Sequence, residues 1–145
     1  MRVSTKVSSG FTLTELAFVL VIIIVFILLL SPFISDIRNR AKLVRCEDNL
    51  QKIGMGLRLY AIEHGEKFPT GFEELMQGGY LESERSFDCP GLAHTGTAKE
   101  PDYHYVTGYE VSSPSESMLV FDKDENHTGG KHVLYVNSDI KWLAR

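Results

Sequence analysis

The pattern of apolar residues divides the chain into an apolar segment, an amphipathic segment and a mixed C-terminal part. The apolar segment contains a run without any charged residue, glycine or proline at residues 16–30. This run is the core of a twenty-residue segment, 11–30, in which only Thr12, Thr14 and Glu15 are polar. About 20 apolar residues in a helix cross the roughly 30 Å hydrocarbon core of a bilayer. Residues 11–30 therefore predict one transmembrane helix.

A second pattern follows the apolar run. Apolar and aromatic side chains recur every three or four positions, which is the spacing of one face of an amphipathic helix. They are Leu43, Cys46, Leu50, Ile53, Leu57, Tyr60 and His64. Gly65 is a suitable residue to end this helix. Segments 11–30 and 31–65 together predict a single helix of about fifty residues, roughly 75 Å long at 1.5 Å per residue.

Residues 66–145 predict a small head in which short strands replace the helical pattern. Thr70 to Glu73 has the spacing of a capping box, which predicts a short helix that ends before Gly78-Gly79. The apolar or alternating runs predict strands at 103–107, 118–121, 131–136 and 140–143, and Asn137-Ser138-Asp139 predicts a hairpin between the last two. Residues 91–101 predict a loop. The expected fold is α+β, with the long helix packed against a small antiparallel sheet.

The length and net charge of the chain argue against some classes of function. The chain has 145 residues with 15 Lys and Arg against 19 Asp and Glu, a formal net charge of −4. This balance argues against a nucleic-acid partner, which usually selects a strongly basic surface. The sequence also contains no Gly-x-Ser-x-Gly elbow, phosphate-binding glycine loop or His-Glu-x-x-His motif, so we expect no enzyme activity.

The segment from Gly10 to Glu15, Gly-Phe-Thr-Leu-Thr-Glu, follows a short leader with Arg2 and Lys6 and precedes the apolar run. This arrangement resembles the processing site of type IV prepilins and type II secretion pseudopilins. The resemblance implies that prepilin peptidase cleaves after Gly10 and methylates the new amine of Phe11. Residues 1–10 are then a leader peptide, and glycine at the cut leaves the scissile bond accessible because it has no Cβ.

Glu15 is the one acidic residue inside the predicted span. A carboxylate costs about 2.5–3.5 kcal/mol or more at the centre of a bilayer and less near its surface. One interpretation is that Glu15 lies at headgroup level and marks the start of the span. The resemblance implies instead that it pairs with the Phe11 amine of a neighbouring subunit. Pro32 matches a proline common in the first helix of this family, which in such filaments accompanies local melting during assembly.

The family resemblance implies a structural subunit of a type II secretion pseudopilus or type IV pilus-like filament. Its expected partners are prepilin peptidase, further copies of itself and other pilin-like subunits, and the inner-membrane assembly platform. The alternative is a single-span, membrane-anchored extracytoplasmic binding module. Aromatic side chains of the head could line such a binding site: Tyr103, Tyr105, Tyr109 and Trp142.

Two features of the sequence predict opposite orientations of the chain in the bacterial inner membrane. Positive charges normally stay in the cytoplasm, and more of them follow the span, at Arg38, Arg40, Lys42 and Arg45, than precede it. The prepilin resemblance implies the opposite, with the N-terminus cytoplasmic and the head, residues 66–145, periplasmic before assembly into a filament. We follow the cleavage motif because it is the more specific signal.

Parts of the head have a narrower resemblance. The segments 46–60, 68–69, 87–90 and 126–136 are similar to the pseudopilin-like H-X9-DG proteins of Planctomycetes and Verrucomicrobia. That family has a histidine, nine further residues and then Asp-Gly. Here His127 is present, but Asn137-Ser138 stands in place of Asp-Gly.

The chain has two cysteines, Cys46 and Cys89. In an extracytoplasmic head they are able to form a disulfide, which by closing a loop of about 44 residues would stabilise the fold by roughly 3–4 kcal/mol. Two free thiols are the alternative.

No metal or other cofactor is expected, and calcium is the weaker alternative. Asp122, Asp124 and Asn126 alternate like the ligands of a calcium loop, but glycine is missing at its sixth place and glutamate at its twelfth. No two of the histidines His94, His104, His127 and His132 have a short helical ligand spacing, and no two cysteines are close in sequence. We expect them to be surface or hydrogen-bonded core residues.

Overall fold

A computed structural model of the chain describes residues 12–92 and 94–145. It contains one long helix, α1 (Leu13–Glu63), a short helix α2 (Phe72–Gln77), a 3-10 turn η1 (Glu84–Phe87) and four strands. The chain forms two compact units that meet between Asn39 and Arg40. Helix α1 has 51 residues and passes through both units, which confirms the single long helix predicted from the sequence.

The described part of the first unit, residues 12–39, is the apolar half of α1. The helix begins after Thr12, whose carbonyl oxygen and Oγ1 accept hydrogen bonds from the Glu15 amide at 3.1 and 3.4 Å. Every described side chain from Leu13 to Ser31 is exposed, and the mean hydropathy reaches 3.2 over an 18-residue window. A helix that is apolar on all sides is suited to lipid or to other helices, so this segment is compatible with a single-pass membrane anchor.

The second unit contains an antiparallel sheet of four strands in the order β1-β2-β3-β4. The strands are β1 (Tyr103–Tyr105), β2 (Met118–Asp122), β3 (Gly130–Tyr135) and β4 (Ile140–Ala144). All four lie where the sequence predicts strands, although β1 ends two residues early. The hairpin between β3 and β4 is also confirmed, and its turn places Ser138 at a positive φ of 71°.

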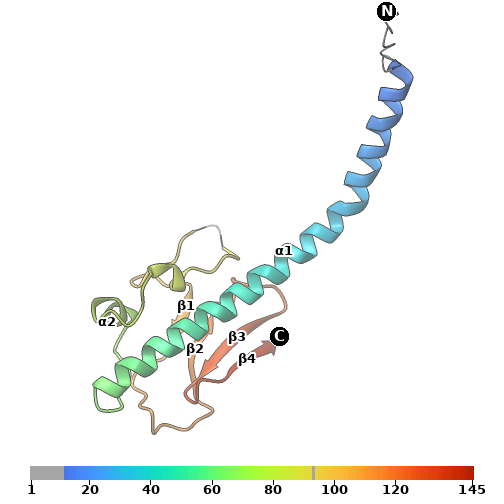
Figure 1. The fold of residues 1–145 in the computed structure, drawn as a ribbon. Helices are drawn as coiled ribbons and strands as arrows, with labels where there is room; N and C mark the ends of the chain where they lie inside the picture. Colours follow the sequence, from blue (N-terminus) through green and yellow to red (C-terminus); the bar gives the residue numbers. More distant parts are fainter. Residues whose placement is uncertain (1–11, 93) are drawn as a thin grey trace, which may run out of the picture. The chain divides into compact units, whose positions relative to one another are not determined.

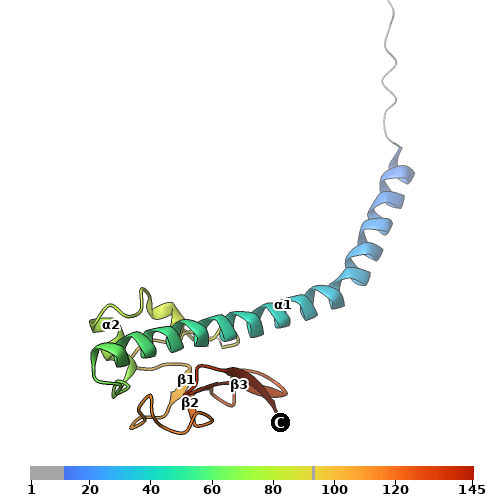
Figure 2. The same cartoon turned by 60° about the horizontal axis from the view of Figure 1, so that its bottom comes forward.

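The C-terminal half of α1 lies along one face of this sheet (Figures 1 and 2). Its buried residues recur with the helical period and form the centre of the core: Cys46, Leu50, Ile53, Leu57 and Ala61. The helix approaches β3 closely at Gly54, where a Cβ would lie 3.2 Å from Leu134 Cδ2. The structure therefore has the α+β, pilin-like arrangement expected from the sequence.

Two local predictions need correction, and one short element was missed. His64 is exposed, because the buried face ends at Ala61, just before the chain turns through Gly65 at a φ of +65°. The residue before α2 is Gly71, which supplies no side-chain cap, and the hydroxyl and amide of Thr70 donate to the carboxylate of Glu74 rather than to Glu73. The turn η1 was not predicted.

The contrast between two leucines on α1 provides a test of this packing. Leu57 is fully buried, whereas Leu59 is 52% exposed. Leu57→Ala is expected to lower the free energy of unfolding by about 2–5 kcal/mol because it leaves a cavity in the core, and Leu59→Ala by only about 0.5 kcal/mol or less. Chemical unfolding of the detergent-solubilised chain measures both. Equal losses would contradict the placement of α1 on the sheet.

Candidate functional site

The residues predicted to direct processing and assembly lie at the start of the chain. Gly10 and Phe11 are outside the described residues. Glu15 lies in the first turn of α1 with its side chain exposed. The helix continues without interruption through Pro32. Cleavage, methylation and the pairing of Glu15 therefore stay predictions.

The head brings the two cysteines together. Cys46 lies on α1 and Cys89 follows η1, and their Sγ atoms are 3.0 Å apart. Both are buried free thiols in this structure. The sequence predicted that these two residues could pair, and the structure places them within reach of each other. The disulfide itself stays a prediction.

The buried sulfur atoms affect each other's ionisation. A hydrogen bond from the Cys46 thiol, and another from His127, lower the pKa of Cys89 although burial opposes this. The same hydrogen bond to Cys89, together with burial, raises the pKa of Cys46. Burial lowers the pKa of His127, but the hydrogen bond to Cys89 and its negative charge outweigh this, so the net shift is upward. The pair therefore favours one thiolate, on Cys89.

His127 also faces a buried carboxylate. Its Nε2 lies 3.6 Å from Cys89 Sγ and 3.8 Å from Asp122 Oδ2. Asp122, at the end of β2, is fully buried, and its Oδ2 accepts hydrogen bonds from the backbone amide of His132 at 2.8 Å and from His132 Nδ1 at 3.0 Å. Two groups of potential ligands thus share His127: one with Cys46 and Cys89, the other with Asp122 and His132.

This cluster was not predicted from the sequence. Its members come from α1, from the segment after η1, from β2 with the loop that follows it, and from β3. His127 and His132 are separated by four residues, a spacing found between histidine ligands of zinc, but the two cysteines are far apart in sequence. The other two histidines agree with the expectation: His94 is an exposed partner of Asp102 at 2.6 Å, and His104 is exposed. The signals in the sequence were separate from one another: the possible cysteine pair, Asp122 as a calcium candidate, and His127 in the H-X9-DG-like segment.

The three weak calcium candidates have different surroundings. Asp122 is buried beside the histidines, whereas the side chain of Asp124 is 79% exposed and lies 3.0 Å from Arg145 Nη2. Asn126 is buried, and its Nδ2 donates to the Asp102 carbonyl oxygen at 2.7 Å. Among the described residues, Asp122 Oδ1 and Asn126 Oδ1 have no hydrogen-bond partner, and calcium stays an untested alternative.

The four aromatic residues considered for a binding site also differ in their burial and contacts. Tyr103 is buried in the core, and Asn49 Nδ2 donates to its hydroxyl at 3.2 Å. The Tyr105 hydroxyl donates to the Pro69 carbonyl oxygen at 2.7 Å. Trp142 is partly exposed and packs edge-on against His132. Tyr109 and Tyr105 are partly buried and pack against the core with Tyr103, whereas Trp142 is 40% exposed.

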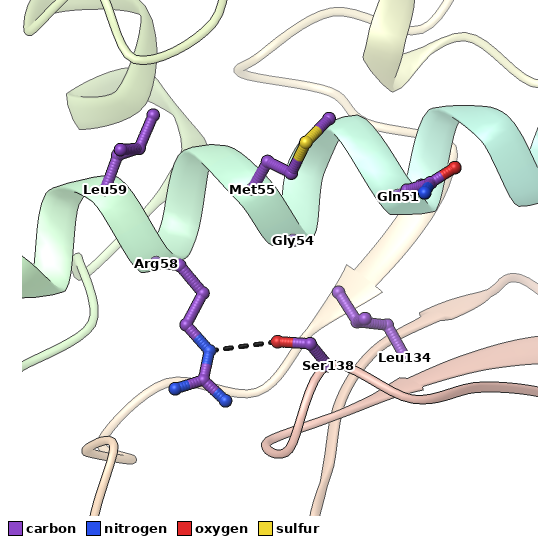
Figure 3. Close-up of a pocket in the computed structure, with 7 residues that line it drawn as sticks. All are labelled: Gln51, Gly54, Met55, Arg58, Leu59, Leu134 and Ser138. Carbon is purple, nitrogen blue, oxygen red and sulfur yellow. Dashed lines mark hydrogen bonds between the residues drawn. The ribbon is translucent and has the colours of Figure 1, made fainter.

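A further exposed apolar surface lies on the half of α1 that belongs to the second compact unit, residues 40–145. Met55, Leu59 and Ile62 are each more than half exposed. Met55 and Leu59 also line a pocket between α1 and the β3–β4 hairpin, shown in Figure 3. At its edge, Arg58 Nε donates to Ser138 Oγ at 2.9 Å. Exposed apolar surface of this kind is typical of protein contact sites.

A long N-terminal helix, apolar and exposed in its first half and packed on a small antiparallel sheet in its second, defines the pilin-like class of proteins. Comparison with known protein families finds no matching family model, and comparison with solved structures finds no match. The chain is 30% identical over 82 residues to the competence protein ComGC of Halalkalibacterium halodurans, a match that covers 57% of this chain and 76% of the relative. The chain therefore belongs to the family of pilin-like proteins that includes ComGC.

This relationship defines the general role of the chain. It is a pilin-like pseudopilus subunit, a structural protein and not an enzyme, that assembles with other pilin-like subunits. The relationship supports the broad family and does not extend to the H-X9-DG group.

Proposed function

We propose that this chain is a subunit of a type II secretion pseudopilus or type IV pilus-like filament, held in the bacterial inner membrane until assembly. In this proposal residues 11–30 span the membrane, residues 31–65 complete the long helix, and residues 66–145 form the extracytoplasmic head. The relative is a competence protein, which adds a competence filament to the candidate systems.

One observation carries this proposal most directly. The first half of α1 is apolar and exposed on all sides, yet it begins with a carboxylate at Glu15. A simple membrane anchor has no need for this charge, which is costly within hydrocarbon unless it has a partner. A filament supplies the partner, because the apolar helices then pack together and a neighbouring amine can face the carboxylate.

The N-terminal processing follows from the same pairing. Cleavage after Gly10 creates the positively charged amine of Phe11, which prepilin peptidase then methylates. A buried ammonium facing Glu15 satisfies both charges, whereas removing one leaves the other uncompensated, at a cost of roughly 3–5 kcal/mol. The pair therefore sets the axial register between subunits. Local loosening of the helix near Pro32, where a backbone donor is missing, assists entry into the filament.

The topology of the proposal follows the cleavage motif. The leader, residues 1–10, lies in the cytoplasm with the peptidase, and the head lies in the periplasm. The assembly platform in the inner membrane then moves the subunit into the filament. The exposed side chains Met55, Leu59 and Ile62 support additional contacts between heads.

Photo-cross-linking through the apolar helix tests the proposal. A photoreactive phenylalanine analogue replaces Leu20, which is exposed on α1, in cells that carry the complete assembly system. We expect a ladder of covalent multimers after illumination, because the helices pack against one another in the filament. Cells that lack the assembly platform are the matched control and should give far fewer multimers.

The alternative function gives a different result. A membrane-anchored binding module would show the same cross-links with and without the platform. That result would contradict assembly into a filament and would direct the search to a ligand of the head.

A further inference from the structure

The buried side chains around His127, on Cys46, Cys89 and Asp122, are of the types that bind transition metals. Cys46 Sγ, Cys89 Sγ and His127 Nε2 all lie within 4.8 Å of one another. Asp122 adds a carboxylate oxygen 3.8 Å from the same His127 nitrogen. Thiolate, imidazole and carboxylate are the ligand types that Zn²⁺ prefers, and two sulfurs make calcium or magnesium poor occupants.

Two distances between the potential ligands can be compared with those of tetrahedral zinc. With Zn–S about 2.3 Å and Zn–N about 2.0–2.1 Å, a tetrahedral site separates sulfur from nitrogen by roughly 3.5–3.6 Å and the two sulfurs by roughly 3.8 Å. Cys89 Sγ and His127 Nε2 are already 3.6 Å apart. The two sulfurs are 3.0 Å apart and need to separate by less than about 1 Å.

An unsatisfied carboxylate oxygen is the second, independent indication of a ligand. Asp122 is fully buried. Its Oδ2 accepts both hydrogen bonds from His132, whereas its Oδ1 has no hydrogen-bond partner among the described residues. A buried carboxylate oxygen without a partner is costly. A cation bound to Oδ1 would remove this cost, while Oδ2, the oxygen 3.8 Å from His127 Nε2, keeps its hydrogen bonds from His132.

We propose that Cys46, Cys89 and His127 bind one Zn²⁺ ion inside the second compact unit, and that Asp122, which lies beside His127 but outside the group with the cysteines, moves to supply the fourth ligand. His132 is a positioning residue, because the hydrogen bonds from its Nδ1 and backbone amide to Asp122 Oδ2 orient the carboxylate. Such hydrogen bonds to ligating groups are usual around metal sites.

The site would tie together three parts of the head that are distant in sequence. Cys46 belongs to α1, Cys89 to the segment after η1, and Asp122 and His127 to the end of β2 and the loop that follows it. Binding displaces the remaining thiol protons to solvent and forms Zn–S bonds without any change of oxidation state. It also excludes a disulfide between the same two cysteines, so the reduced chain is the one that binds metal.

Metal analysis of the full-length chain in detergent tests this proposal. The chain is purified without chelator, and its zinc content and free thiols are measured. We expect about one zinc ion per chain with both thiols reduced. His127→Gln should lower the zinc content at least about tenfold, whereas His104→Gln should leave it unchanged, because His104 is exposed on β1 and outside the cluster.

A cobalt spectrum of the unsubstituted chain keeps the test decisive if His127→Gln does not fold. The reduced chain is freed of metal and titrated with Co²⁺. A thiolate-to-cobalt charge-transfer band, together with the strong visible bands of tetrahedral cobalt, supports the site. Absence of these bands, or a purified chain that has a Cys46–Cys89 disulfide and takes up no cobalt after reduction, would overturn the proposal.

Discussion

Replacing Glu15 by alanine is expected to keep the chain out of filaments while its cleavage continues. Without the carboxylate, the Phe11 amine of the neighbouring subunit enters the apolar filament interior unpaired, at a cost of roughly 3–5 kcal/mol per contact. This corresponds to a loss of incorporation of roughly 10²- to 4 × 10³-fold. The measurement compares the amount of this chain in sheared filaments with the amount in the membrane.

Glu47→Ala is the matched control for this change. Glu47 is also on α1, but it is exposed in the half of the helix that belongs to the second compact unit. Its removal leaves no buried charge, so incorporation should remain normal. If Glu15→Ala also gave a normal filament yield, the pairing of Glu15 with an amine would be wrong.

Gly10→Leu is expected to stop maturation almost completely. A bulky side chain next to the scissile bond blocks access that glycine, without a Cβ, allows. The chain should therefore retain residues 1–10 and keep its amine away from Glu15, so that filaments also lose this subunit. Intact mass of the membrane-bound chain measures the outcome.

A leucine placed further from the bond is the control for Gly10→Leu. Ser4→Leu adds a similar side chain to the leader and should be processed normally. Efficient cleavage of Gly10→Leu would contradict the assigned cleavage site.

Much of the fold follows from the sequence because it depends on local periodicity. The apolar run and the three-and-four spacing from Leu43 to Tyr60 predict α1, and the alternating runs predict the four strands. Element ends were less predictable. The helix before Gly65 loses its buried face at Ala61, and the start of α2 depends on Thr70 reaching Glu74, one residue beyond the expected partner.

The cysteine and histidine cluster could not be predicted in the same way. Sequence spacing identifies ligands only when they share one helix or one tight loop. Here Cys46 and Cys89 are 43 positions apart, and His127 follows a further 38 positions later. Their proximity depends on how α1 packs on the sheet. The N-terminal motif, in contrast, is continuous in sequence and needed no tertiary information.

The most direct test of the proposed role is the N-terminal residue and mass of this chain in isolated filaments. Filaments are sheared from cells with and without prepilin peptidase, and the chain is analysed by mass spectrometry. The proposal predicts a chain in the filament fraction that begins with N-methylated Phe11, and only when the peptidase is present. A chain confined to the membrane and beginning at Met1 in the presence of the peptidase would contradict it.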